Sequence, residues 1–275
     1  MPSMGARLGM RWMSGRASIS LKRIMKHHAF LSNALKFNDA SACVGTGQVA
    51  EDLGEKFQRI HATDRSSTML SNAVQRPNIV YQQAPAEQLP FADSSVDVVT
   101  SGQAFHWFDH PRFFEEIRRV LKPRGTLAVF GYSYVIVAGN KEATDIIYDY
   151  ANNELGPYWE PGRLLVDNYY RSINFPFRNV QWHFSHEGLD DTGLGKVSSL
   201  QFMEQRVTVE HFETYIKTWS SYATYKDKFP DAEDPAERVV RRLEKVINVN
   251  DRKTDTFTVQ WPTVLILAEN DGYLY

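Results

Sequence analysis

Short apolar runs alternate with amphipathic segments in the first half of the chain, between Ala40 and Phe130. The run Val96–Ser101 is almost continuously β-prone, which is typical of a strand covered on both faces of its sheet. The pattern predicts strands at Ser41–Val44, Arg59–Thr63, Ile79–Gln82, Val96–Ser101 and Thr126–Val137, and helices at Val49–Phe57, Ser67–Val74 and Pro111–Leu121. Strands that alternate with helices indicate βαβ units, so we predict an α/β fold with a doubly wound, mainly parallel sheet.

The character of the chain changes after Gly139. Two strand-like pieces, Val180–Ser185 and Thr256–Leu267, frame most of a region rich in helical patterns. Those helices are expected at Lys141–Leu155, Leu164–Ser172, Val209–Tyr225 and Pro235–Val246. We predict a single domain over residues 39–275, in which residues 140–250 form a helical insertion before the last strand. Open α/β sheets bind ligands outside the carboxyl ends of their strands, so such an insertion can act as a lid over a substrate.

Charge separates the first 38 residues from the rest. Residues 1–38 contain seven Lys or Arg and no acid, whereas the remaining residues hold 24 bases and 33 acids. The basic, acid-free start has the composition of a mitochondrial transit peptide; the alternative is a disordered or wrongly assigned start. The acidic remainder argues against nucleic acid as a substrate, because phosphate binding needs clustered Lys and Arg.

Composition narrows the class of protein further. A single cysteine, Cys43, excludes a disulfide framework and suggests a reducing compartment. No run approaches 18 apolar residues, so we expect no membrane contact. The histidines show no metal-ligand spacing, so we expect no metal, and the missing G-x-S-x-G motif argues against an α/β-hydrolase. We expect a cytoplasmic monomer, with a mitochondrial location as the alternative.

A glycine turn, Gly45-Thr46-Gly47, lies between the first predicted strand and the first predicted helix. Glycines there let a ligand approach the backbone, and the helix N-terminus offers free N–H groups. Asp64 lies at the predicted end of the second strand, where a carboxylate can accept both hydroxyls of a ribose. With Ala50 the turn also fits the dinucleotide-binding pattern G-x-G-x-x-A. The structural alternatives are a plain turn and a helix-capping aspartate.

The glycine turn and Asp64 fit a dinucleotide cofactor and also other cofactors that contain a nucleoside. Further motifs distinguish these two interpretations. They are GTGQ at 45–48, ATDRSSTML at 62–70, AEQLPF at 86–91, HWF at 106–108, RVLKPRG at 119–125, YWEPGR at 158–163 and TWSSY at 218–222. Together, over roughly residues 43–268, the chain resembles class I S-adenosylmethionine-dependent methyltransferases with a type 11 methyltransferase domain, and in particular the fungal trans-aconitate methyltransferase family. The resemblance implies the Rossmann-like fold of that class and S-adenosylmethionine as cofactor.

The resemblance also implies a set of cofactor-binding residues. Gly45, Thr46 and Gly47 would face the methionine part, and Asp64 would bind the ribose. The adenine would lie near Met69 and border Ala86 and Glu87, and the sulfonium end would lie beside Ser101 and Gln103. The alternatives are a core position on a helix for Met69 and a solvated loop acid for Glu87.

His106, Trp107 and Phe108 follow the fourth predicted strand, where an acceptor should meet the methyl group. We assign His106 and Trp107 as catalytic and Phe108 as substrate-binding. His106 could serve as general base for a hydroxyl acceptor or orient a carboxylate, which needs no base. Arg163 and Arg171 are candidates for gripping an acidic substrate, because a guanidinium binds a carboxylate in a fork. The alternatives are a packed aromatic cluster and surface arginines.

The implied function is O-methylation of a small molecule by S-adenosylmethionine, with a carboxylate such as an aconitate-like acid as one acceptor. The first strand departs from the family pattern: Ser41 stands in place of its usual acid and Cys43 in place of its first glycine. The usual N-terminal helix is also not recognisable. A catalytically impaired relative is therefore the alternative, and an NAD-dependent oxidoreductase is a further one.

Overall fold

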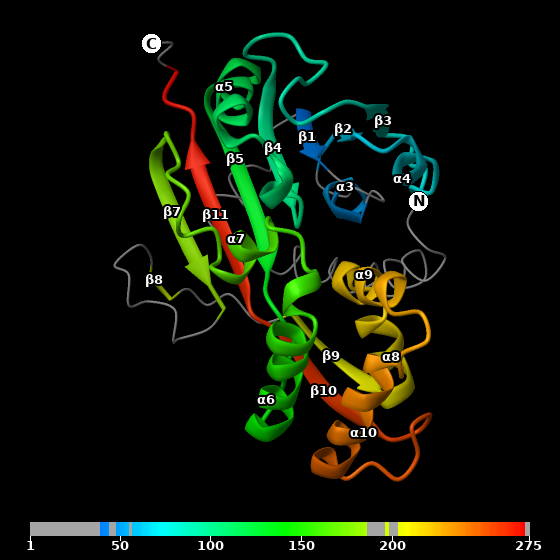
Figure 1. The fold of residues 1–275 in the computed structure, drawn as a ribbon. Coiled ribbons are helices and arrows are strands. Elements are labelled where there is room, and N and C mark those ends of the chain that lie inside the picture. Colours follow the sequence, from blue (N-terminus) through cyan, green and yellow to red (C-terminus); the bar gives the residue numbers. More distant parts are fainter. Residues whose placement is uncertain (1–38, 44–47, 55–56, 186–195, 198–202, 273–275) are drawn as a thin grey trace. The chain divides into compact units, whose positions relative to one another are not determined.

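The computed structural model describes residues 39–43, 48–54, 57–185, 196–197 and 203–272 (Figure 1). The chain divides into two compact units, which are described separately. The sheet unit holds the described residues up to Tyr132, residues 168–197 and residues 263–272. The helical unit holds residues 133–167 and 203–262. Whether the two form one domain, with residues 140–250 as a lid, stays a prediction.

An eight-stranded sheet organises the sheet unit, in the order β3-β2-β1-β4-β5-β11-β7-β8. The strands are β1 (Asp39–Cys43), β2 (Arg59–Asp64), β3 (Ile79–Gln83), β4 (Val96–Gly102), β5 (Leu121–Tyr132), β7 (Arg178–Phe184), β8 (Lys196–Val197) and β11 (Thr263–Glu269). Neighbours from β3 to β5 are parallel, and β11 is antiparallel to both β5 and β7. The predicted doubly wound, mainly parallel α/β sheet is confirmed.

The core of this unit lies along its central strands. Residues 96–101 of β4 are all buried, as the almost continuously β-prone run predicts for a strand covered on both faces. The helices and turns of the unit are α3 (Gln48–Leu53), α4 (Ser67–Ser71), the 3₁₀ turn η2 (Phe105–Trp107) and α5 (His110–Val120). Asp109 caps α5, and its buried face carries Phe113, Ile117 and Val120.

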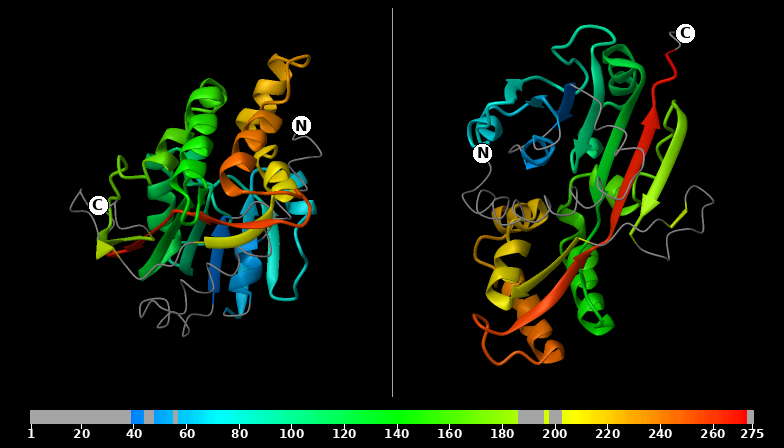
Figure 2. Two further views of the ribbon diagram at one scale, coloured as in Figure 1. Left: turned by 90° about the horizontal axis from the view of Figure 1, so that it is seen from below. Right: turned by 180° about the vertical axis from the view of Figure 1, so that it is seen from behind.

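The helical unit combines a three-stranded sheet with helices. The sheet has the order β6-β10-β9, formed by β6 (Ile136–Val137), β10 (Thr256–Trp261) and β9 (Met203–Thr208). The helices are α6 (Lys141–Asp149), the π-helical turn η3 (Tyr150–Glu154), the 3₁₀ turn η4 (Gly156–Tyr158), α7 (Arg163–Asp167), α8 (Val209–Ile216), α9 (Ser220–Lys228) and α10 (Pro235–Ile247). Figure 2 shows two further views of these elements.

Several predicted boundaries were wrong, for identifiable reasons. The predicted strand at 256–267 is two strands in different sheets, separated at Pro262, which has no N–H for a ladder. The predicted strand at 126–137 likewise begins earlier, at Leu121, and splits into β5 and β6. The predicted helix at 164–172 ends at Asp167, and the one at 209–225 breaks at Trp219, whose backbone is extended.

β9 was not predicted, because its buried alternation of Met203, Gln205 and Val207 contains a polar residue. A pattern of period two is readable only when the inward positions are apolar.

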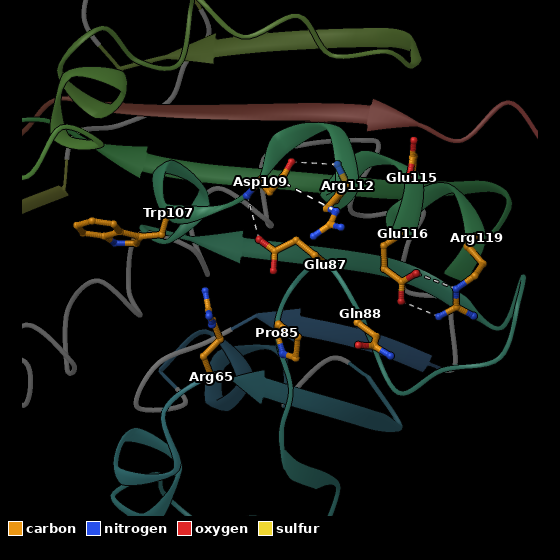
Figure 3. A pocket seen from close by; sticks show the side chains of 10 residues that line it. All are labelled: Arg65, Pro85, Glu87, Gln88, Trp107, Asp109, Arg112, Glu115, Glu116 and Arg119. Atoms are coloured by element: carbon orange, nitrogen blue, oxygen red, sulfur yellow. Dashed lines mark hydrogen bonds and ion pairs between the residues drawn. The ribbon is translucent and has the colours of Figure 1, made fainter.

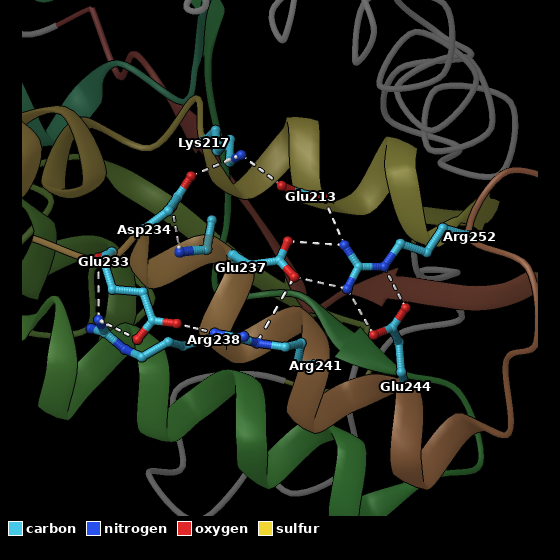
Figure 4. Close-up of polar contacts among 10 residues, drawn as sticks. Glu213, Lys217, Glu233, Asp234, Glu237, Arg238, Arg241, Glu244 and Arg252 are labelled. Carbon is cyan, nitrogen blue, oxygen red and sulfur yellow. Dashed lines mark hydrogen bonds and ion pairs between the residues drawn. The ribbon is translucent and has the colours of Figure 1, made fainter.

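Ion pairs tie the last turns of the helical unit together (Figure 4). Arg252 donates to both oxygens of Glu237, at 2.9 and 3.0 Å, and to Glu244 at 2.8 Å. These two acids lie seven residues apart on α10, so one arginine spans two turns of that helix. Lys217, the residue directly after α8, bridges Glu213 at 2.6 Å and Asp234 at 2.9 Å.

Candidate active site

The direction of the chain through the sheet reverses between β1 and β4. From β1 the chain moves outward to β2 and β3, then returns to β4 and continues to β5 on the other side. Ligands of such sheets bind outside the carboxyl ends of the strands at this point. The predicted cofactor turn, Gly45-Thr46-Gly47, belongs here but lies outside the described residues.

The glycine at the end of β4 indicates how closely the elements approach there. A Cβ added to Gly102 would stand 2.8 Å from Cγ2 of Val49 on α3. Real Cβ atoms do not come so close, so a side chain at this position would push Val49 of α3 away from the end of β4.

Asp64 ends β2 and is half-buried. Its Oδ1 accepts a hydrogen bond from the Ser66 N–H at 2.7 Å, which fixes the carboxyl group at the strand end. Burial raises the pKa of the Asp64 carboxyl, and the Ser66 N–H offsets part of that rise. A fixed, partly desolvated carboxylate is suited to accept hydrogen bonds from a ligand's hydroxyl groups.

In α4, the helix after Asp64, the neighbouring residues Met69 and Leu70 differ in burial. Ser66 caps α4 by accepting from the Met69 N–H at 3.3 Å. Leu70 is buried in the core, whereas Met69 is only half-buried. The core position on this helix is therefore filled by Leu70, and Met69 faces partly outward. Its place near an adenine stays a prediction.

The loop after β3 is fastened to α5. Ala86 is buried, and Oε1 of Glu87 accepts from the Asp109 N–H at 2.9 Å. Glu116 of α5 accepts from the Leu89 N–H and is paired with Arg119 at 2.7 Å. Arg119 also donates to the backbone oxygens of Leu89 and Phe91 in the loop. Glu87 thus links the loop to the helix, and its predicted contact with adenine stays a prediction.

Two of the predicted cofactor-binding residues lie at the end of β4, Ser101 as its last but one residue and Gln103 directly after it. Ser101 is buried, and among the described residues its Oγ has no hydrogen-bond partner. Gln103 has a left-handed backbone with φ 50°. Its side chain donates to the Tyr132 oxygen at 3.1 Å and accepts from the Tyr132 N–H at 2.9 Å, which ties the ends of β4 and β5 together. Gln103 therefore shapes the strand end; its contact with the sulfonium stays a prediction.

The aromatic segment after β4 divides into inward and outward positions. Phe105 is fully buried, and Phe108 packs edge-on against it at 6.1 Å. Phe108 also contacts Phe113 of α5 at 4.9 Å, so it belongs at least in part to the packed aromatic cluster. Trp107 is 56% exposed, and His106 is half-buried.

His106 has a partner that sequence reasoning missed. Its Nδ1 lies 3.3 Å from the hydroxyl oxygen of Tyr170, a residue 64 positions later in the chain. No periodicity indicates such a contact, because residues 164–172 read as one helix and the structure breaks it before Tyr170. The next residue, Arg171, packs its guanidinium over the rings of Phe184 at 5.1 Å and Tyr169 at 5.9 Å.

Arg163 lies in the helical unit inside a group of aromatic rings. Its guanidinium carbon is 4.2 Å from the ring centre of Tyr134 and 5.0 Å from that of Trp159. Tyr134, Trp159 and Trp219 contact one another at 5.6 to 5.9 Å, and we call these rings with Arg163 the arginine cage. Cations over aromatic faces are held by the ring quadrupole, most strongly when desolvated.

Asp167 completes the arginine cage and was not predicted either. Its Oδ1 is 2.9 Å from Nε of Arg163, four residues earlier on α7. Burial raises the pKa of Asp167, and the charge of Arg163 offsets part of the rise. The spacing of four residues is the one available signal, because side chains at that spacing meet on a helix.

A polar cavity of about 810 Å³ begins at the carboxyl ends of β2, β3 and β4, near Trp107, and runs along α5 toward the amino end of β4, near Arg119 (Figure 3). Its walls come from the segments that follow these strands and from α5. The lining residues are Arg65, Pro85, Glu87, Gln88, Trp107, Asp109, Arg112, Glu115, Glu116 and Arg119. Trp107 lies at one end of the row, and Arg119 at the other. The lining includes four acids and three arginines, so the cavity carries both charges.

These residues fit S-adenosylmethionine. Asp64 offers a fixed carboxylate for ribose hydroxyls, and the buried Ser101 hydroxyl has no hydrogen bond to a described residue. Gly102 keeps the space between β4 and α3 small. When bound, the cofactor supplies an electrophilic methyl group on a sulfonium, and Asp64, Met69, Ala86 and Ser101 are the described residues that would hold it.

Comparison with known proteins agrees with this fit. Residues 41–129 match the sequence profile of a family described as a methyltransferase domain. A Dictyostelium discoideum protein provisionally named a methyltransferase is 26% identical over 233 residues, which cover 82% of this chain and 80% of that protein. A Saccharomyces cerevisiae protein provisionally named an S-adenosylmethionine-dependent methyltransferase is 25% identical over 265 residues, or 90% and 89% of the two chains.

A solved structure shares the fold. It is that of a type II methyltransferase, provisionally so named, from Anaeromyxobacter dehalogenans, with a TM-score of 0.68 and 27% identity. The match covers 86% of this chain and 91% of the other. The sheet order and the strand-end residues thus define a class I, Rossmann-like methyltransferase fold. The chain is an S-adenosylmethionine-dependent methyltransferase of this class.

The described residues lack two further features, a metal site and a membrane-spanning helix. No group of three or more His, Cys, Asp or Glu in that part of the chain could hold a metal ion. Among the same residues, no helix has the length and apolar character needed to cross a membrane.

Proposed function

We propose that the enzyme transfers the methyl group to an oxygen atom of a small molecule, with a carboxylate as the preferred acceptor. The observation that supports this best is the arginine cage. The Arg163 side chain is only 16% exposed, and its Nε lies 2.9 Å from Oδ1 of Asp167, so it already meets one carboxylate. A guanidinium has five N–H donors in a planar fork, so its terminal nitrogens can bind a second carboxylate.

The aromatic rings suit a compact organic acid. Tyr134, Trp159 and Trp219 offer flat apolar faces, and Arg163 offers a charge that fixes orientation. Small-molecule sites commonly combine apolar walls with a few placed polar groups. Apart from residues 1–38 the chain is acidic, which disfavours nucleic acid as the acceptor. We expect a monomer acting on a free substrate, without a membrane, in the cytoplasm or alternatively in mitochondria.

A carboxylate acceptor requires little chemical help from the protein. Its oxygen is already ionised, so it forms the new O–C bond as the C–S bond breaks, and no proton moves. Holding acceptor oxygen, methyl carbon and sulfur in line can supply roughly 7–11 kcal/mol of the barrier. In the sheet unit, His106 is the residue expected to orient a carboxylate at the end of β4, and the exposed Trp107 and then Phe108 follow it in the chain.

Two measurements on the full chain test the proposal. Isothermal titration with S-adenosylhomocysteine first establishes that the cofactor site is competent. A mass-shift screen then compares small carboxylic acids with alcohols and phenols of similar shape. We expect a methyl adduct on the acids that sodium hydroxide removes, because esters hydrolyse and ethers do not. Methylation confined to alcohols or phenols, or a product stable to base, would refute the carboxylate proposal.

A further inference from the structure

The turn Asn168–Arg171 in the sheet unit has an unexpected composition. The Arg171 N–H donates to the Asn168 oxygen at 3.0 Å, and both central residues have positive φ, 51° for Tyr169 and 61° for Tyr170. Two positive values are the pattern of a type I′ turn, which is normally built from Gly, Asn or Asp. Bulky residues there cost about 1–3 kcal/mol each, and they persist only where the surroundings hold them.

The surroundings hold the ring of Tyr170 closely. The residue is fully buried, and its ring meets that of Phe105 edge-on at 5.2 Å. On β5, a Cβ added to Gly131 would stand 2.7 Å from Cε2 of Tyr170. Only a glycine at this position leaves room for the ring. The strained turn, Gly131 and Phe105 together fix the direction of the Tyr170 side chain.

The fixed side chain carries its one polar atom to His106. The hydroxyl oxygen lies 3.3 Å from Nδ1, and the two rings are nearly parallel, with 18° between their planes. A partner on one ring nitrogen of a histidine sets both the ring orientation and the position of its proton. We propose that Tyr170 is a positioning residue: it orients His106 and sets its tautomer for methyl transfer.

The preferred tautomer follows from the acceptor, so this part rests on the proposed function. When the Tyr170 hydroxyl donates to Nδ1, the imidazole proton is on Nε2 and can be donated to an anionic oxygen. His106 then acts as a hydrogen-bond donor that orients a carboxylate. A hydroxyl acceptor would need the opposite arrangement, with the ring proton on Nδ1 and Nε2 as proton acceptor.

The test replaces Tyr170 by phenylalanine in the full-length protein, which removes the hydroxyl and keeps the ring that packs on Gly131 and Phe105. Tyr169→Phe is the matched control, because it removes a neighbouring hydroxyl from the same turn. Nitrogen-15 NMR of the imidazole, in the presence of S-adenosylhomocysteine, reports the tautomer of His106. We expect the Nε2–H form in the parent protein, a mixture of tautomers in Tyr170→Phe, and the parent spectrum in Tyr169→Phe.

Kinetics then separate positioning from a merely structural role. We expect Tyr170→Phe to lower kcat about 10- to 100-fold, since small misplacements of reacting groups cost that much, with S-adenosylhomocysteine affinity unchanged. In a His106→Ala background the same substitution should have no further effect, because both residues act as one unit. An unchanged His106 spectrum in Tyr170→Phe, or an equal loss of rate in both backgrounds, overturns the inference. The change of the His106 spectrum in Tyr170→Phe needs no acceptor, so the positioning role of Tyr170 stands or falls separately from the carboxylate proposal, whereas an Nδ1–H form in the parent protein would contradict only the carboxylate.

Discussion

The sheet unit and the helical unit present their chemistry in different ways. In the sheet unit the candidate residues follow the ends of strands: Asp64 ends β2, Ser101 lies near the end of β4, and His106 comes just after it. In the helical unit, Arg163 gains its surroundings from Tyr134 and Trp219, which are 29 and 56 residues away. Strand ends are fixed by topology, whereas a cage of distant rings depends on packing. The sequence therefore predicts where cofactor-binding residues lie in the fold better than where acceptor-binding residues lie.

The largest expected effect is on the stability of the sheet unit and comes from replacing Arg119 of α5. Its guanidinium neutralises the buried Glu116 and also holds the loop after β3. Arg119→Met leaves an unpaired buried carboxylate, and we expect the free energy of unfolding to fall by about 3 kcal/mol. This is the low end for a buried pair, because a third of the arginine is exposed. Urea denaturation measures the loss.

Arg112→Met is the matched control for Arg119. Arg112 lies on the same helix, and its side chain is 77% exposed. Its Nε is 4.0 Å from Oδ2 of Asp109, a long distance for an ion pair. An exposed pair of this kind contributes about 0–0.5 kcal/mol. If the two variants lose the same stability, the loop is not held by the Glu116–Arg119 contacts.

A slightly smaller effect is expected on the affinity for the cofactor, from a substitution at Asp64. Asp64→Asn keeps the size of the side chain and removes the charge that would bind the ribose hydroxyls. A hydrogen bond to a charged group contributes about 1.5–3 kcal/mol, which corresponds to about 10- to 150-fold in Kd. Isothermal titration with S-adenosylhomocysteine measures it. Asp93→Asn, at an exposed position in the same unit, is the control. Equal affinity in the parent and Asp64→Asn would remove Asp64 from the cofactor site.

These cases indicate what the sequence can predict. Asp64 and His106 were predicted as site residues because each lies at or soon after the end of a predicted strand, within a motif that carries the resemblance. Tyr170 was not found, because helical periodicity continued to Ser172 while the chain turned after Asp167. Asp167 was missed although it lies four residues after Arg163, since a pair at that spacing is usually on a solvated surface. Burial, which gives such a pair its importance, is set by tertiary packing.

The arginine cage leads to the next prediction, on substrate binding. Arg163→Met keeps an apolar side chain between Tyr134 and Trp159 but removes the fork. We expect KM for a carboxylate acceptor to rise about 10-fold, as the loss of one charge-assisted hydrogen bond implies, with S-adenosylhomocysteine affinity unchanged. Steady-state kinetics measure it. Arg242→Met, which breaks an exposed pair with Asp149 in the same unit, is the control. An unchanged KM in Arg163→Met would place the acceptor site elsewhere.

The smallest effect concerns the ion pairs of the helical unit and depends on pH. Hydrogen bonds from Arg252 hold the pKa of Glu237 below its ordinary value of 4.5. The folded protein therefore binds fewer protons at Glu237 than the unfolded chain, so this stabilisation is present above pH 4.5 and is lost as the pH falls through the lowered pKa. Arg252→Met should cost about 1–2 kcal/mol at neutral pH, because the pairs are partly exposed. The deficit should shrink below pH 4.5, since protonated Glu237 no longer needs the arginine.

Urea denaturation of Arg252→Met on both sides of that pH, with Arg242→Met beside it, tests this directly. In Arg242→Met the pKa of Asp149 keeps the lowering by the Asn153 hydrogen bond, its largest cause, and loses the lowering by Arg242. That variant should therefore flatten the dependence on pH less than Arg252→Met does. A constant deficit of Arg252→Met at every pH would mean that Arg252 stabilises α10 by packing its aliphatic chain. The helical unit would then be held by the same apolar contacts as the sheet unit, and its ion pairs would contribute little.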